Sequence, residues 1–307
     1  MNAIYVETWR RGELARRVED SRNALRDCQM CGCRCGVNRL AGEAGLCDTG
    51  LNAVVSSYGP RFGGEIGWGG VGNIFFSHCN LGCVFCQNSE VSQLGRGHEA
   101  TAQELAEMML ALQQGGCHNI NLVSPSHVAP QIIEGLQIAA SRGLSIPLIY
   151  NTGGYDSLDA LHLLEGVIDI YMPDMKYADE EVGWRYSGVR GYPAINRAAV
   201  KEMHRQVGDL KLDEGGTVVS GLVVRHLVLP NGLAGTAETA RFLAQEVSRD
   251  TYLNITPDYR PCYRAAEFPE LSRPVSPQEF LEALDLARQA GLVRLDESHG
   301  AFLMRTD

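Results

Sequence analysis

The sequence has no long hydrophobic run. No apolar segment of the 307-residue chain approaches the roughly 18–20 residues that a membrane-spanning helix needs. The first residues, from Met1 to Glu7, also lack the basic and apolar regions of a secretory signal. We therefore expect a protein that does not bind or cross a membrane and that works in the cytoplasm.

An excess of positive charge is missing too. The formal net charge of −10 argues against a nucleic-acid-binding surface, so no nucleic acid is expected among the partners. Hydrophobic residues make up 45% of the chain and charged residues 21%, which is an ordinary globular composition. The length allows one barrel-like domain with a full core, plus an extension.

Cysteine, in contrast, is abundant. Ten cysteines in a chain without an export signal indicate metal ligands in a reducing compartment instead of disulfides. Three of them have the spacing Cys79-x3-Cys83-x2-Cys86. Three thiolates on one short loop can hold three irons of a [4Fe–4S] cluster and leave the fourth iron open for a substrate or cofactor. The alternative is a zinc site with a fourth ligand such as His78 or His98.

Two further features of this loop carry expectations. Gly82 should let the loop turn back tightly, because glycine takes a positive φ without steric cost. Apolar side chains around the cysteines should exclude water from the cluster; they are Phe75, Phe76, Val84 and Phe85.

The loop resembles the radical S-adenosylmethionine (SAM) superfamily. The resemblance rests on the cysteine spacing, on Asn80 after the first cysteine and on Phe85 before the third. It implies that the open iron binds SAM and that the reduced cluster cleaves SAM to methionine and a 5′-deoxyadenosyl radical. A low-potential donor such as flavodoxin or ferredoxin would supply the electron.

A second group of cysteines lies between residues 28 and 47. Cys28, Cys31, Cys35 and Cys47 form a C-x2-C-x3-C-x11-C set, which suffices for a closed four-thiolate site holding zinc or an auxiliary iron–sulfur cluster. Cys33 is an extra cysteine, and the sequence leaves open whether it replaces a neighbour. We favour a metal that stabilises a core-poor segment over a cluster that relays electrons.

The rest of the chain alternates short β-rich runs with helical patterns, which predicts βα units and a parallel sheet. The expected strands are 73–77, 119–124, 148–151, 168–172, 222–229 and 252–256. The expected helices are 9–27, 101–115, 128–142, 157–165, 197–210, 237–248 and 277–290. The fold class is therefore α/β, a partial (βα)6 barrel of the radical SAM type over residues 61–307, after a helix and Cys-rich metal-binding extension over residues 1–60.

Two connecting segments carry their own predictions. The Gly-rich stretch from Tyr58 to Gly72 should act as a hinge between the two parts. The run from Leu292 to Leu295 should close the open edge of the barrel.

Polar residues follow the expected strands and should converge on one rim. We expect SAM contacts from the residues Ser124, His127, Asn151, Asp174, Lys176 and Arg225. Lys176 and Arg225 are candidates for the carboxylate of SAM, and Asp174 for its ribose, a cation or a partner's backbone. A plain ion pair between Asp174 and Lys176 is the alternative. His127 and His226 either line the pocket or are satisfied core residues.

One branch of the superfamily is especially similar, the pyruvate formate-lyase activating enzymes and their relatives with a Cys-rich N-terminal extension. The shared features are Asp174-x-Lys176, Arg225-x4-Pro230 and the segments 35–39, 86–88 and 256–261. The resemblance implies a hydrogen abstraction that installs a glycyl radical on a partner enzyme. Many members hold the SAM amino group with Gly-Gly-Glu after the second strand, where this chain has Ser124-Pro125-Ser126-His127.

Other functions stay open beside this one. A radical SAM enzyme acting on a small molecule or a peptide side chain is one alternative, and a non-enzymatic iron–sulfur or zinc protein is another. Two cysteines lie outside both sets: Cys117 is expected to be a small core residue, and Cys262 is a candidate hydrogen-atom donor facing the cavity.

Overall fold

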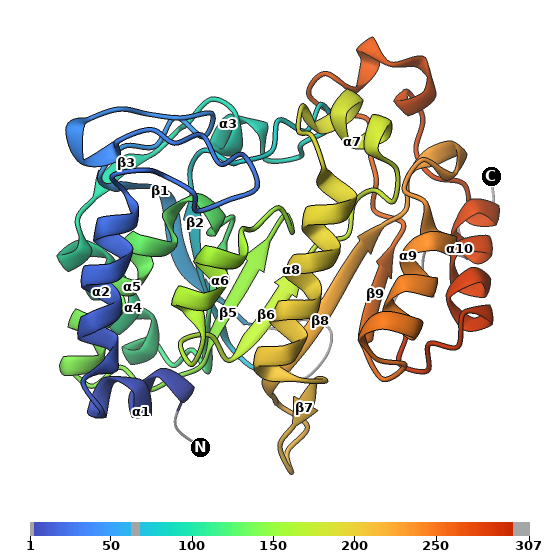
Figure 1. Cartoon of the computed structure of the whole chain (residues 1–307). Coiled ribbons are helices and arrows are strands. Elements are labelled where there is room, and N and C mark those ends of the chain that lie inside the picture. Colours follow the sequence, from blue (N-terminus) through green and yellow to red (C-terminus); the bar gives the residue numbers. More distant parts are fainter. Residues whose placement is uncertain (1–2, 63–67, 297–307) are drawn as a thin grey trace.

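A single mixed sheet with helices packed around it forms the body of the molecule (Figure 1). The computed structural model describes residues 3–62 and 68–296. The strand order is β3-β1-β2-β4-β5-β6-β8-β7, and β9 pairs with β8 beside this path. No helix among the described residues is long and apolar enough to span a bilayer.

Six of the strands run parallel and form the predicted partial barrel. They are β2 (Val71–Phe76), β4 (Asn119–Val123), β5 (Leu148–Thr152), β6 (Ile170–Pro173), β8 (Val218–Leu227) and β9 (Tyr252–Thr256). Each is hydrogen-bonded in parallel to the next in that order. The α/β fold and the six strands of the (βα)6 prediction are confirmed, and all strand carboxyl ends lie at one rim.

The connecting helices cover the outside of this sheet (Figure 1). They are α4 (Ala102–Gln114), α5 (Ala129–Ser141), α6 (Leu158–Leu164), α7 (Glu180–Ser187), α8 (Tyr192–Val207), α9 (Thr236–Phe242, continued by a π-turn over Leu243–Val247) and α10 (Pro277–Gln289). Thr101 and Glu104 form the reciprocal capping box that starts α4. Short 3-10 turns fill the remaining connections, at Arg39–Ala41, Ser126–Val128, Pro230–Gly232, Ala265–Glu267 and Pro269–Leu271.

The N-terminal part differs from its prediction. The helix expected over 9–27 is two helices, α1 (Ile4–Arg10) and α2 (Glu13–Ala24). The break lies at Gly12, whose φ of 72° is left-handed and cannot continue a right-handed helix. Both helices pack on the barrel, because Tyr5 and Leu14 are fully buried in its main core.

Two antiparallel strands near the predicted hinge were missed, and they correct it. β1 (Ala53–Arg61) pairs antiparallel with β2, and β3 (His98–Ala100) pairs with β1. Residues 58–61 are therefore part of the sheet and not a linker, while Gly63, Gly64 and Gly67 lie outside the described residues. β1 pairs with β2 across the expected boundary at residue 60, and the division into two domains stays a prediction.

The far edge of the barrel is covered as expected. Leu295 forms a parallel bridge with Leu253 of β9, and the Leu253 N–H donates to the Arg294 carbonyl oxygen at 3.0 Å. β7 (Lys211–Leu212) is a short antiparallel addition to β8. The edge strand β9 is thus paired with the C-terminal segment.

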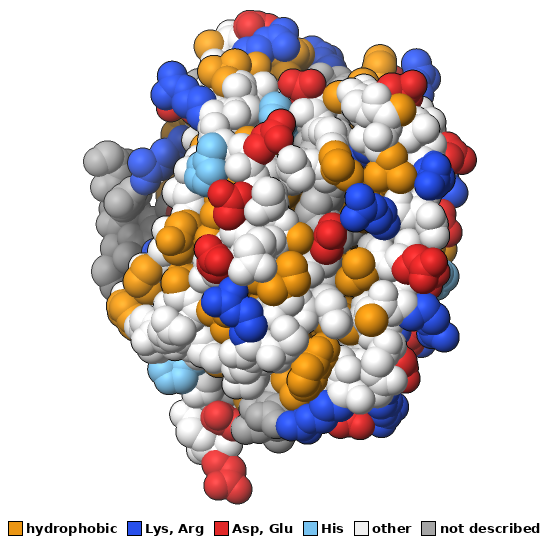
Figure 2. Space-filling model, turned by 90° about the vertical axis from the view of Figure 1, so that its left-hand side faces the viewer, with side chains coloured by type: hydrophobic (Ala, Val, Ile, Leu, Met, Phe, Trp, Pro, Cys, Tyr) orange, Lys and Arg blue, Asp and Glu red, His pale blue; other side chains and the backbone are white. Residues whose placement is uncertain are grey.

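Charge is dispersed over the face shown in Figure 2. There, basic and acidic side chains alternate with separate hydrophobic ones, and neither sign forms a broad patch. The net charge of −10 is therefore not concentrated on that face.

Candidate functional site

The three-cysteine loop begins directly after β2, at the carboxyl rim of the barrel. β2 ends at Phe76, and His78 takes a left-handed φ of 64° that redirects the chain into the loop. Gly82 is not among the residues with positive φ, so the left-handed backbone expected there is wrong. Glycine at this position instead allows the backbone of the loop to approach that of Ser187 closely. The Gly82 N–H donates to the Ser187 carbonyl oxygen at 2.8 Å, and a Cβ on Gly82 would lie 3.3 Å from that oxygen.

The loop is packed by apolar side chains and by hydroxyl groups. Leu81, Val84 and Phe85 are buried, and the Phe85 ring meets those of Tyr177 and Tyr259 edge to face. This confirms the expected burial of Val84 and Phe85 beside the cysteines.

Each of two thiols has a serine partner. The Cys83 Sγ lies 2.9 Å from the Ser187 Oγ, and the Cys86 Sγ lies 3.0 Å from the Ser92 Oγ. Burial, reinforced by the nearby Cys83 thiol, raises the pKa of Cys79 to about 12. Burial also raises the pKa of Cys83, an effect that Lys176 and the Ser187 hydroxyl partly oppose. Cys79 and Cys83 therefore stay neutral thiols until a bound metal displaces their protons.

Two cations and one carboxylate meet beside this loop. Asp174 follows β6, and its carboxylate lies 2.6 Å from the Lys176 Nζ and 2.7 Å from the Arg225 Nη2. Burial alone would raise the pKa of Asp174, but Arg225 and Lys176 hold it below its usual value. The pKa of Lys176 is raised, because Asp174 and Cys83 outweigh the opposing effect of burial. The ion pair that the sequence offered as an alternative is present, and it includes Arg225.

This triad leaves a surplus of positive charge at the rim. Lys176 and Arg225 share one carboxylate. Lys176 is also close enough to Cys79 and Cys83 to oppose, in part, the rise that burial causes in the pKa of both thiols. The site can therefore attract an anionic group next to the cysteine loop. The side chain of Arg225 is 36% exposed against 17% for Lys176, so it is the more accessible of the two.

The other predicted contacts divide into two kinds. Ser124 has a left-handed φ of 58° at the end of β4, and the buried Asn151 lies on β5. His127 is buried, and its Nε2 lies 2.9 Å from the Ser77 carbonyl oxygen. His226 is buried between the Met175 carbonyl oxygen and the Thr236 Oγ1. Both histidines are core residues. His226 has a partner at each ring nitrogen, whereas the Nδ1 of His127 has no hydrogen-bond partner among the described residues.

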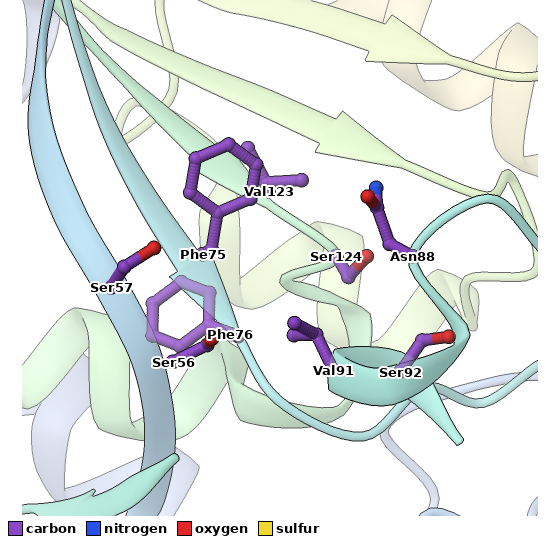
Figure 3. A pocket seen from close by; sticks show the side chains of 9 residues that line it. All are labelled: Ser56, Ser57, Phe75, Phe76, Asn88, Val91, Ser92, Val123 and Ser124. Carbon is purple, nitrogen blue, oxygen red and sulfur yellow. The ribbon is translucent and has the colours of Figure 1, made fainter. Parts of the chain in front are cut away.

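A cavity of about 240 Å³ opens between β1, β4 and the helix α3 (Ser89–Ser92) that follows the cysteine loop (Figure 3). Figure 3 shows Phe75 and Val123 on one side and Ser124, Asn88 and Ser92 on the other. Its lining consists of Ser56, Ser57, Phe75, Phe76, Asn88, Val91, Ser92, Val123 and Ser124. Ser56 and Ser57 belong to β1, a strand that was not predicted, so their place in this lining was not predicted either.

The N-terminal cysteines lie next to this rim. The thiol of Cys33 donates to the Asn80 carbonyl oxygen at 3.5 Å, and Cys31 forms a backbone bridge with Asp156. Burial raises the pKa of Cys35, as do its neighbours Cys28 and Cys31. Among the described residues, no three thiol, imidazole or carboxylate groups converge on one point where they could hold a metal ion. The zinc or second cluster predicted here is therefore not supported by a preformed single-ion site.

The last two cysteines are also placed. Cys117 is buried just before β4, in the main core, as expected. The thiol of Cys262 donates to the Phe85 carbonyl oxygen at 3.1 Å, which places it against the cysteine loop. Its role as a hydrogen-atom donor stays a prediction.

Comparison with known proteins supplies a family. The family model described as the radical SAM superfamily matches residues 73–226. A curated relative, an uncharacterised protein of Methanocaldococcus jannaschii, is 30% identical over 287 residues, which is 90% of this chain and 78% of that protein.

Solved structures with weaker likeness were also found. Streptococcus suis SuiB bound to precursor peptide SuiA has a TM-score of 0.49 at 11% identity, over 72% of this chain and 47% of that one. Methylornithine synthase (PylB) has a TM-score of 0.45 at 16% identity, over 73% and 69% of the two chains. The chain thus spans about half the length of the SuiB chain that it matches.

Proposed function

Because the chain belongs to the radical SAM superfamily, we propose that Cys79, Cys83 and Cys86 hold its [4Fe–4S] cluster and that SAM binds beside them, at Lys176 and Arg225. Family membership implies an enzyme that uses such a cluster and SAM, which sets the non-enzymatic alternative aside. When bound, the cluster supplies the electron that cleaves SAM to methionine and a 5′-deoxyadenosyl radical.

The residues present fit a cluster of this kind. Three thiols lie on one loop at the carboxyl rim of a parallel sheet, where functional groups of such folds gather. A cubane holds each thiolate at a separate iron, so the thiols need not converge on one point. The Ser187 and Ser92 hydroxyls can donate to Cys83 and Cys86 once these are thiolates, which stabilises their charge.

The proposed SAM site depends on the positive charge that Lys176 and Arg225 leave beside the loop, because the two cations share the single carboxylate of Asp174. Arg225 is the better-exposed partner of Asp174 and can turn one N–H face toward a carboxylate, while Asp174 keeps Lys176 in position. Ser124 and Asn151 stay predicted contacts for the rest of SAM, and so does the ribose role of Asp174. Apolar packing around Phe85 keeps water away from the loop.

The test is SAM cleavage by reduced, anaerobically prepared protein. Replacing Cys83 by alanine should abolish the cluster absorbance and the formation of 5′-deoxyadenosine, because two thiolates cannot hold the cubane. Cys117→Ala is the matched control, since Cys117 is buried away from the loop. Retained cleavage in Cys83→Ala would refute the proposal.

The finer proposal is an activase that installs a glycyl radical on a partner enzyme, in the cytoplasm, with flavodoxin or ferredoxin as electron donor. It is supported by the resemblance in Asp174-x-Lys176 and Arg225-x4-Pro230. Electron paramagnetic resonance on the reduced protein with SAM and candidate partners tests it: a glycyl signal that needs SAM supports it, and its absence with every partner favours the alternative.

The alternative substrates are a small molecule and a peptide side chain, and the size of the cavity bears on the choice between them. The cavity beside Ser124 measures about 240 Å³, which is smaller than the roughly 300–1,000 Å³ of ordinary small-molecule pockets. Such a space admits a compact group next to the cysteine loop.

A further inference from the structure

The side chain of Arg39 is the least expected feature of the N-terminal part. It is 1% exposed, and its Nε and Nη1 donate to the carbonyl oxygens of Gly50 at 2.8 Å and His127 at 2.7 Å. Its Nη2 is buried and has no hydrogen-bond partner among the described residues. A guanidinium stays charged at any working pH, so a full positive charge is buried here.

No carboxylate among the described residues pairs with this charge. The third contact of Arg39 is the Cys28 Sγ, 3.9 Å from Nη1, and the guanidinium also lies near Cys47. Burying an unpaired ion is costly, and proteins avoid it unless neighbouring groups supply the opposite charge. The neighbours available to supply it are thiols.

The four cysteines of the predicted set lie in the same segment as this charge, and Cys28 contacts it, although no three of the described thiols converge on one point. Cys28, Cys31 and Cys47 are each buried, at 4%, 6% and 7% exposure. Cys28, Cys31 and Cys35 lie on one loop. Two backbone hydrogen bonds close it, from the Cys28 N–H to the Val37 carbonyl oxygen and from the Gly36 N–H to the Cys28 carbonyl oxygen. The segment before Cys47 packs onto that loop so closely that a Cβ on Gly45 would lie 2.5 Å from the Cys35 Sγ.

Cys33 lies beside Cys31, between the set and the three-cysteine loop. Its thiol donates to the backbone of Asn80, the residue after Cys79, in the three-cysteine loop. Figure 1 shows the N-terminal loops beside α3, at the same end of the molecule as that loop. Cys33 thus links the two parts through the Asn80 backbone, and the other four cysteines of the segment form the candidate ligand set.

We propose that Cys28, Cys31, Cys35 and Cys47 bind a metal centre as thiolates and that the buried guanidinium of Arg39 balances its negative charge. Four thiolates outweigh the charge of a zinc ion and of an iron–sulfur core alike, so either centre is a net anion that needs a nearby cation. Each thiol loses its proton to solvent as the metal binds. The shared chemistry is a four-thiolate site for a soft metal, and the proposal holds whether or not the SAM reaction is as described above.

The experiment removes the other cluster first. In the full chain, Cys79, Cys83 and Cys86 are all replaced by alanine, and the protein is loaded either with zinc alone or with iron and sulfide, anaerobically. We expect about one zinc, or about four irons with matching sulfide, to remain bound per chain after desalting. The zinc and iron arms identify which centre forms; no retained metal in either arm overturns the proposal.

Two further replacements in that background assign the ligands. Cys47→Ala should lose the metal, whereas Cys33→Ala and Cys117→Ala should keep it. Metal retained by Cys47→Ala, or lost from Cys33→Ala, contradicts the assignment.

The role of Arg39 is tested with all four candidate ligands in place, so the result does not depend on whether a cysteine variant folds. Arg39→Met should release metal to a competing chelator about 10–100-fold more readily, as is usual when a group that supports metal ligands is removed. Arg39→Lys keeps the charge and should fall between Arg39→Met and the parent. If Arg39→Met is folded and holds metal as tightly as the parent, the guanidinium does not balance a metal centre.

Discussion

Asp174 determines how the rim presents its positive charge. One carboxylate holds two cations at 2.6 and 2.7 Å, and it is itself only 17% exposed. Because both partners lower its pKa, Asp174 stays ionised, and the cluster of three charges keeps a net positive charge beside the cysteine loop. The pairing fixes the position of Lys176, whereas Arg225 remains accessible to a ligand.

His127 gives a pH-dependent prediction. Burial lowers its pKa from the ordinary value of 6.5 to about 3, so the folded protein holds it neutral. The unfolded chain binds a proton more readily between these pH values, so the stabilising contribution is full above pH 6.5 and is lost as the pH falls. Between pH 6.5 and 5 the free energy of unfolding should drop by about 2 kcal/mol through this residue.

Urea unfolding of His127→Gln against the parent measures this effect. Burial raises the pKa of Asp169 to about 6, so its contribution to the free energy of unfolding changes with pH in the opposite direction. Both proteins contain Asp169, so its contribution cancels when the variant is compared with the parent. His127→Gln should be less sensitive to pH by the amount given, and His98→Gln, an exposed site on β3, should match the parent. Equal pH slopes for His127→Gln and the parent would contradict the assignment.

Among the secondary-structure elements, the break between α1 and α2 depends on Gly12. Its φ of 72° is left-handed, and a Cβ there would meet no atom within 4 Å, so any cost of Gly12→Ala comes from the backbone alone. We expect that variant to lose about 1–2 kcal/mol of unfolding free energy. Gly59→Ala in β1 has equal space and no left-handed φ, and should be neutral or slightly stabilising. Urea unfolding of the pair measures both, and a neutral Gly12→Ala would show that the left-handed backbone is not what separates the helices.

The sequence predicted the six parallel strands because each is a short apolar run between turn or helix signals. The meeting of Asp174, Lys176 and Arg225 followed from the same pattern, since parallel strands end at one rim. β1 was not predicted, because its carboxyl half continues into a Gly-rich segment. Its antiparallel pairing with β2 also depends on tertiary contacts that the local sequence does not specify. Ser56 and Ser57 of the cavity, and the burial of Arg39, depend on that packing and left no local pattern to find.

For the whole molecule, the question is whether residues 1–60 form a separable extension. Tyr5 is fully buried, and its hydroxyl donates to the Ile146 carbonyl oxygen at 3.0 Å. The Thr8 hydroxyl donates to the Gly166 carbonyl oxygen, and the Ile4 N–H donates to the Asp169 carboxylate. These contacts join the N-terminal helices to the amino-end side of the barrel, and β1 covers the edge of β2 on the other flank.

A chain reduced to residues 61–307 should therefore fail to fold on its own. It would expose the hydrogen-bonding edge of β2 and uncover the surface on which Tyr5 and Leu14 are buried, and an open apolar edge of this kind promotes aggregation. We expect no cooperative urea transition and strong binding of a hydrophobic dye, whereas the full chain should unfold in one transition. Supplying residues 1–60 as a separate peptide tests whether the loss is one of contacts, because it should restore part of the folded signal. A cooperative transition of residues 61–307 with the urea midpoint of the full chain would instead establish the barrel as an independent domain.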